Sequence, residues 1–315
     1  MQDLIILAAL LIMLAIGVGT LASMLGIGGG VIMVPLLIIV FGLSPLLAPS
    51  TTLLAALFAA IGSSLAYHRQ KPRPVIVKAG VFLAATSVPG SVVGVWLRLL
   101  VPGDFALRLI FAVLLLPIAI RMLFAKKKGE SDYVSEVGSF QFSRVTNQKL
   151  VYSLIGSFCA GILSGLLGIG GGVLMVPVFS MVMGLPMHAA VATSMLTMIF
   201  TAMSGTVMNY LTGEIDLFYS AMLSIGMVTG AQFGPKLIRR VNAVRLKQIF
   251  GVVLVLPLIK MAELGQLWLD PTKVSYLIAT VGDIIIWLAI VTPVAMIRVV
   301  QSRRQLRTRE SPTQG

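Results

Sequence analysis

The length of the uncharged, apolar stretches restricts the fold of this chain more than any other feature. No Asp, Glu, Lys, Arg or His occurs from Leu4 to Tyr67, and between Lys149 and Glu214 the only such residue is His188. A membrane-spanning helix needs about 20 apolar residues, so each stretch holds several spans. Charged residues make up 11% of the chain, against about 25% in soluble domains. We therefore interpret the chain as an all-α polytopic membrane protein that lies in the lipid bilayer.

Apolar segments divide each half of the chain in a similar way. They run over 4–25, 31–42, 50–67, 75–99 and 105–123 in the first half, and over 149–167, 173–184, 190–211, 216–235 and 246–262 in the second. A last segment, 274–297, has no counterpart. Segments 31–42 and 173–184 cover only about 18 Å, short of the roughly 30 Å hydrocarbon core. We interpret these two as half-helices.

Two glycine-rich blocks indicate an internal duplication. Residues 24–35 read MLGIGGGVIMVP, and residues 166–177 read LLGIGGGVLMVP. A shift of 142 residues superposes Gly26 on Gly168 and Pro35 on Pro177. The sequence therefore predicts two homologous repeats of about five membrane segments each, counting the half-helices, plus one extra C-terminal span.

This organisation predicts five regions along the chain. They are a first transmembrane repeat, 1–124; a cytoplasmic linker, 125–148; a second transmembrane repeat, 149–262; an extra transmembrane segment, 263–297; and a basic cytoplasmic tail, 298–315.

The distribution of basic residues predicts the orientation in the membrane. The formal net charge is +13, and the basic residues cluster in Arg69–Lys78, Arg121–Lys128, Lys236–Lys247 and Arg298–Arg309. Short loops rich in Lys and Arg face the cytoplasm, so we interpret the clusters as topology signals rather than as a nucleic-acid surface. Every cluster falls inside if the N-terminus is outside, the C-terminus is cytoplasmic and the repeats are inverted. Two copies of four crossings would instead give parallel repeats. We expect a multi-pass protein of the cell (inner) membrane.

The glycine blocks suggest a binding site for a small anion. Gly28, Gly29 and Gly30 precede one half-helix, and Gly170, Gly171 and Gly172 precede the other. The first N–H groups of a helix lack intrahelical acceptors and carry partial positive charge, so two such ends can bind an anion without a fixed cation. Glycine in membrane helices can instead only allow close packing. That alternative stays open.

Polar residues within the spans extend the candidate site. Hydroxyl groups come from Thr51, Thr52, Thr193 and Ser194, and amide groups from Asn209 and Gln232. Hydroxyls in membrane helices often bond only to the carbonyl groups of the preceding turn.

Ionisable side chains near the ends of the spans have less defined roles. His68 and His188 could couple transport to protons, or could be merely interfacial. Arg98 lies near the end of a segment, where its side chain can extend to the interface. The sequence holds no catalytic motif and one cysteine, so we expect neither an enzyme, nor a metal site, nor a cofactor.

The twin Leu-Gly-Ile-Gly-Gly-Gly-Val-x-Met-Val-Pro blocks, with Ala192-Thr193-Ser194 downstream, resemble the sulfite exporter TauE/SafE family of membrane permeases. The resemblance covers residues 4–262. It implies a secondary transporter without an ATPase domain, which moves sulfite, sulfoacetate, other sulfonates or related organic acids. An anion channel and a non-transporting membrane scaffold are the alternatives. The sequence leaves open whether the protein forms a homo-oligomer.

Overall fold

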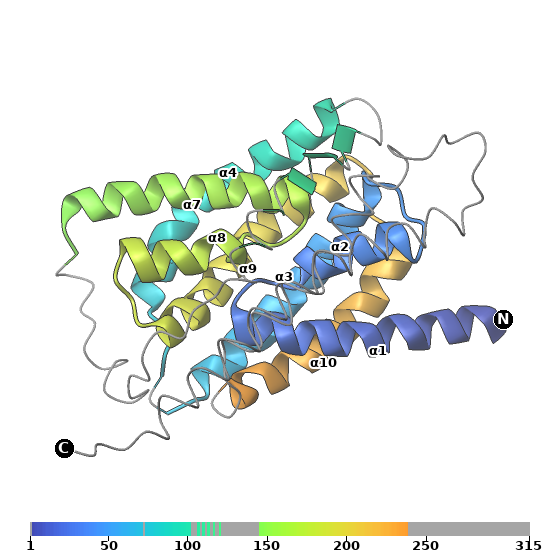
Figure 1. The fold of residues 1–315 in the computed structure, drawn as a ribbon, viewed down its shortest axis with the longest axis horizontal. Coiled ribbons are helices and arrows are strands. Elements are labelled where there is room, and N and C mark those ends of the chain that lie inside the picture. Colours follow the sequence, from blue (N-terminus) through green and yellow to red (C-terminus); the bar gives the residue numbers. More distant parts are fainter. Residues whose placement is uncertain are drawn as a thin grey trace, which may run out of the picture. The chain divides into compact units, whose positions relative to one another are not determined.

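The structure is a computed structural model, and it describes residues 2–71, 73–101 and 145–238, with residues 106, 107, 109, 110, 112, 113, 116 and 120 between them. Every regular element in these residues is a helix (Figure 1). The elements are α1 (Gln2–Leu25), α2 (Gly30–Ile39), α3 (Leu47–His68), α4 (Val77–Leu100), α7 (Asn147–Leu167), α8 (Gly172–Pro177), the π-helical turn η2 (Val178–Val182), α9 (Met187–Leu211) and α10 (Leu217–Leu237). The predicted all-α class is confirmed for this part of the chain.

Several predicted regions lie outside the described residues. They are segments 246–262 and 274–297, the tail 298–315 and most of the linker 125–148. By its internal contacts the chain divides into two units, Met1–Phe111 with Lys126–Leu246, and Ala112–Ala125 with Lys247–Gly315. All the helices named above belong to the first unit.

Five of the described helices are long and apolar enough to cross a membrane. They are Ile6–Leu25, Leu47–His68, Val77–Leu100, Asn147–Leu167 and Met187–Leu211. Among these five helices, the largest differences from the predicted segments are at the starts of α3 and α9, where Pro49 lies in the first turn and Pro186 directly precedes the helix. Proline is tolerated at a helix start because its missing N–H would have no intrahelical acceptor there. Both helices therefore begin earlier than predicted.

The outer helices pack in pairs, α1 along α10 and α7 along α4, with their backbones in contact. A Cβ atom at Gly230 would overlap the carbonyl group of Ile16, and one at Gly90 would overlap the carbonyl group of Phe158. Ile16 and Phe158 are 142 residues apart, so the equivalent carbonyl group of each predicted copy meets a glycine of the other copy. Small residues allow such close approach, which holds helices together in lipid by dispersion. Between the pairs lie α3 and α9, the two most buried spans.

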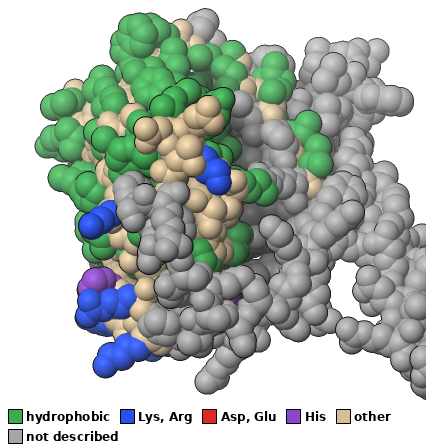
Figure 2. Space-filling view, turned by 90° about the vertical axis from the view of Figure 1, so that its left-hand side faces the viewer, with side chains coloured by type: hydrophobic (Ala, Val, Ile, Leu, Met, Phe, Trp, Pro, Cys, Tyr) green, Lys and Arg blue, Asp and Glu red, His purple; other side chains and the backbone are tan. Residues whose placement is uncertain are grey.

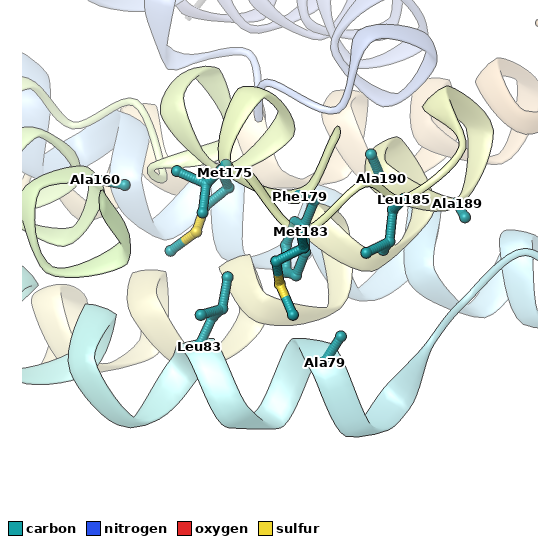
Figure 3. Packing of buried hydrophobic residues seen from close by; sticks show 10 residues of the cluster. Ala79, Leu83, Ala160, Met175, Phe179, Met183, Leu185, Ala189 and Ala190 are labelled. Carbon is teal, nitrogen blue, oxygen red and sulfur yellow. The ribbon is translucent and has the colours of Figure 1, made fainter. Parts of the chain in front are cut away.

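Apolar side chains hold one side of the short segment Gly172–Val182 against the protein. Met175, Phe179 and Met183 are buried in one cluster with Leu83 of α4, and Figure 3 shows the methionine side chains directed toward α4. A segment too short to span, with irregular backbone at its ends, is stable at membrane depth only where protein surrounds it. The cluster supplies those surroundings on the side of the segment that faces α4, whereas Met181 is exposed.

Basic side chains collect at one end of the helices. Gln70 Nε2 donates a hydrogen bond of 2.6 Å to the carbonyl group of Pro235, which joins the loop after α3 to the end of α10. The exposed basic residues in these segments are Arg69, Lys71, Arg73, Lys78 and Lys236. Figure 2 shows Lys and Arg side chains gathered at the lower left of one face, with others nearer its middle, and hydrophobic side chains mainly in the upper part. These loops are the ones that the sequence predicts to be cytoplasmic.

Candidate anion site at two helix breaks

Two helix breaks, one after α1 and one after α7, have the same backbone conformation. The glycines with positive φ are Gly26 (+73°), Gly28 (+80°) and Gly29 (+80°) in the first break, and Gly168 (+67°), Gly170 (+74°) and Gly171 (+80°) in the second. Side chains with a Cβ rarely adopt this region, whereas glycine enters it freely. The three-glycine pattern in each block therefore follows from the turn that the backbone makes.

The two breaks touch each other. A Cβ atom at Gly30 would overlap the carbonyl group of Gly168, and a Cβ atom at Gly172 would overlap the carbonyl group of Gly26. Neither Gly30 nor Gly172 has a positive φ, so the contact, and not the backbone conformation, requires glycine there. All four residues are buried. Two segments far apart in the sequence thus meet through their backbones.

Met198 of α9 lies against both breaks. Its sulfur atom is 2.6 Å from the position that a Cβ atom would take at Gly28, and equally close to that position at Gly170. Methionine is flexible and fills irregular space. A movable thioether therefore lies against equivalent glycines of both breaks.

The first turns of α2 and α8 have N–H groups available for a ligand. The carbonyl group of Gly29 accepts the N–H of Met33 at 3.0 Å, and the carbonyl group of Gly171 accepts the N–H of Met175 at 3.1 Å. Within the described residues, the N–H groups of Gly30 and Gly172 form no hydrogen bond. Unpaired N–H groups at the positive end of a helix are suited to an anion.

Two of the predicted hydroxyl groups lie at the breaks. Thr52 Oγ1 donates to the carbonyl group of Gly168 at 3.2 Å, and Ser194 Oγ donates to the carbonyl group of Gly26 at 3.1 Å. Each hydroxyl group has one proton, and each also lies within 2.9 Å of a carbonyl oxygen of its own helix. Thr52 and Ser194 therefore tie each break to the other copy, and their protons are directed at backbone carbonyl groups rather than at a ligand.

The other two predicted hydroxyl groups are used elsewhere. Thr51 Oγ1 accepts the N–H of Asp216 at 3.4 Å, and Thr193 Oγ1 accepts the N–H of Ile76 at 3.0 Å. These bonds hold the residues just before α10 and α4. The structure therefore assigns Thr51 and Thr193 to the ends of helices and not to the breaks.

The two predicted amides are not brought together. Gln232 Nε2 donates to the carbonyl group of Gly62 at 3.0 Å, which links α10 to α3. Asn209 lies near the end of α9, where its Oδ1 accepts a hydrogen bond from Arg98. One of the two amide hydrogens of Gln232 thus already has a backbone acceptor.

The two histidines lie at helix ends, as the sequence indicates. His68 is the last residue of α3 and is exposed, and His188 is the second residue of α9 and is partly exposed. No group of three or more His, Cys, Asp and Glu residues that could hold a metal ion is found in the described ranges.

A known protein family matches the part of the chain that contains both breaks. The sulfite exporter TauE/SafE family model matches residues 11–261, a range that includes both glycine blocks. The chain belongs to the sulfite exporter TauE/SafE family. It is accordingly a membrane transporter with several membrane-spanning helices.

Relatives of this TauE/SafE protein are bacterial and archaeal. The probable membrane transporter protein YunE of Bacillus subtilis is 28% identical over 260 residues, which cover 78% of this chain and 94% of YunE. A probable membrane transporter protein of Methanocaldococcus jannaschii is 24% identical over 267 residues, covering 80% of this chain and 94% of that protein. No solved structure matches the chain.

In this TauE/SafE protein the interpretation of Arg98 from sequence is wrong. Its side chain does not extend to the interface but is fully buried, at 0% exposure. The guanidinium group donates hydrogen bonds to the Gly165 carbonyl group at 3.2 Å, to Ser50 Oγ at 2.8 Å and to Asn209 Oδ1. Gly165 precedes Gly168 by three residues, which is about 4.5 Å along a helix. A fixed cation therefore lies one helical turn from the second break, contrary to the expectation of a cation-free centre.

Proposed function

We propose that this TauE/SafE protein is a secondary transporter of small sulfur-containing or organic anions, such as sulfite, sulfoacetate or other sulfonates, across the cell membrane. The observation that carries the proposal is the direct contact between two breaks of closely similar conformation, each followed by a short helix with unpaired first N–H groups. An anion between the breaks would receive backbone N–H donors and the positive ends of two helices.

Inverted repeats would provide alternating access to such a site. In Figure 1, α1 begins at the N-terminal label and α7 begins at the opposite side of the view, so the two helices run in opposite directions. The first helix of each copy packs on the fourth helix of the other. This packing supports rocking between a bundle of α1, α3 and α10 and a bundle of α4, α7 and α9, with α3 and α9 in contact at the centre.

The distribution of charged residues supports the proposed orientation. The exposed basic residues that follow α3 would face the cytoplasm, and the N-terminus would be outside. For the coupling ion we propose the proton, which His68 and His188 at helix ends could carry.

Counterflow of labelled sulfite into vesicles that contain the purified protein tests the proposed function. A transporter gives saturable uptake that unlabelled sulfite inside the vesicles accelerates. Uptake that rises linearly with concentration and shows no counterflow would indicate a channel. Vesicles with no uptake above the protein-free level would favour a scaffold.

The variant Gly171→Ala tests whether transport depends on the second break, and Gly184→Ala is its matched control. φ is +80° at Gly171 and +81° at Gly184, so alanine costs a similar strain of about 1–3 kcal/mol at both. A Cβ atom at Gly184 meets nothing within 4 Å, whereas one at Gly171 lies 3.2 Å from the Ala160 carbonyl oxygen. We expect counterflow to fall about tenfold or more only in Gly171→Ala. An equal loss in both variants would assign the effect to backbone strain.

A further inference from the structure

Arg98 is a buried cation whose hydrogen-bond partners among the described residues are all neutral. Its exposure is 0%, and its recorded partners are a backbone carbonyl oxygen, the Ser50 hydroxyl group and the side-chain oxygen of Asn209. None of the described residues forms an ion pair with it. Glu214 contributes a charge that acts on Arg98 from the segment after α9, without a direct bond. A buried charge is strongly unfavourable unless an opposite charge and hydrogen bonds compensate it, and here only part of that compensation is present.

Two hydrogen-bond donors in this cluster are unused. Arg98 Nε and Asn209 Nδ2 are buried and have no hydrogen-bond partner among the described residues. Such donors are rare, since leaving one unpaired costs about 1–3 kcal/mol. Both belong to side chains that already bond to each other, so the two open donors lie in the same cluster. An oxyanion could accept from both.

The other copy has a comparable bond between helices at the place equivalent to Asn209. Gly165 and Asn209 correspond, by the shift of 142 residues, to Ser23 and Tyr67. The Tyr67 hydroxyl group donates to the Ser23 carbonyl group at 2.9 Å, as Arg98 donates to Gly165. A neutral tyrosine therefore joins α3 to α1 at the place that corresponds to Asn209. Arg98 itself corresponds by the same shift to Arg240, which lies outside the described residues.

We propose that Arg98 and Asn209, steadied by Ser50, form a second anion-binding site, for the sulfonate or sulfite group of a small anion. The site would hold the anion at the end of the bundle where α4 and α9 finish, before or after it occupies the breaks. The inference rests on the proposed function for the choice of ligand. Because both open donors are sealed from solvent, the anion reaches them when α3, which carries Ser50, moves away from α4 and α9 in the proposed rocking motion.

The variant Asn209→Asp distinguishes an anion-binding role of Arg98 from a purely structural one. The substitution keeps the size of the side chain and the oxygen that Arg98 contacts, but it supplies an internal counter-ion. A structural arginine would then be held at least as firmly, and thermal stability would be kept. An anion site would be neutralised, and an arriving anion would be repelled.

The measurement is the affinity of the full chain for methanesulfonate and sulfite, taken from ligand-dependent thermal unfolding. We expect Asn209→Asp to raise Kd about tenfold or more. Arg98→Lys keeps the charge but loses Nε and the planar fork, so we expect a smaller rise. Tyr67→Phe is the matched control at the equivalent place, and its Kd should equal that of the unaltered protein.

If Asn209→Asp or Arg98→Lys binds methanesulfonate as tightly as the unaltered protein, the proposed second site is wrong. If Asn209→Asp does not fold, Asn209→Ala and Arg98→Lys carry the same comparison. Counterflow measured in parallel distinguishes the two proposals. Normal counterflow in the unaltered protein, with unchanged Kd in the variants, rejects the second site alone. Binding that Asn209→Asp abolishes, in a protein without counterflow, rejects the transport function and keeps the site.

Discussion

Replacing Gly172 with alanine tests whether the two helix breaks really touch. Gly172 has no positive φ, so alanine is not strained there, and within a helix alanine gains about 1 kcal/mol over glycine. The new Cβ atom, however, would overlap the Gly26 carbonyl group and lie 2.9 Å from the Ile27 Cα atom. Both obstacles are backbone, so no side-chain rotation relieves the overlap. Overpacking of this kind costs about 1–3 kcal/mol, so we expect a net destabilisation of up to about 2 kcal/mol.

Transport should suffer more than stability, because relief of the overlap separates the breaks. We expect Gly172→Ala to fold, to unfold at a lower temperature, and to lose counterflow. Gly17→Ala is the matched control, since Gly17 lies within α1 and a Cβ atom there meets nothing within 4 Å. Thermal unfolding in detergent and sulfite counterflow in vesicles are the two assays. If Gly172→Ala matches Gly17→Ala in both, the breaks are not in contact and the reasoning fails.

Two further predictions concern the hydrogen bond between Thr52 and Gly168 and the orientation of the protein in the membrane. Thr52→Val removes the hydroxyl group that donates to the Gly168 carbonyl group. We therefore expect the free energy of unfolding to fall by about 1 kcal/mol and counterflow to become severalfold slower. Unchanged counterflow would show that this hydrogen bond plays no part in transport. In a Cys159→Ala background, an impermeant maleimide should label Leu217→Cys in intact cells, and Lys71→Cys only after permeabilisation. The reverse pattern would invert the proposed topology.

The helices could be predicted from the sequence because their signals are local. Apolar runs interrupted by glycine gave α1, α2, α7 and the short segment Gly172–Val182 to within a few residues. A half-helix is evident from its length alone, since about 18 Å cannot cross the hydrocarbon core. Glycine spacing also gave the breaks, because a turn with positive φ at three positions needs glycine at each.

Which polar side chains lie at the breaks is decided by partners far away in the sequence. The sequence alone therefore did not distinguish the side chains at the breaks from those used elsewhere. Thr51 and Thr52 are neighbours of the same kind, yet one accepts an N–H from the segment before α10 and the other donates to the second break. Neighbouring residues on a helix face different sides, and only the packing decides which side meets the break. Propensity and spacing carry no such information.

Arg98 shows the same limit. An arginine near the end of an apolar span ordinarily reaches the interface, and the sequence offers no acidic partner in the same span. Its burial depends on Asn209, 111 residues further along the chain. A hint was present in the polar residues Ser50 and Asn209, which interrupt spans that are otherwise apolar.

The location of a bound anion tests the central claim most directly. Selenite is a heavier analogue of sulfite, and a crystal structure with saturating selenite would reveal it by anomalous scattering. The account predicts a peak between the breaks, within about 2.7–3.2 Å of the backbone nitrogens of Gly30 and Gly172. A peak near Arg98 alone, with none between the breaks at a concentration that saturates transport, would contradict it.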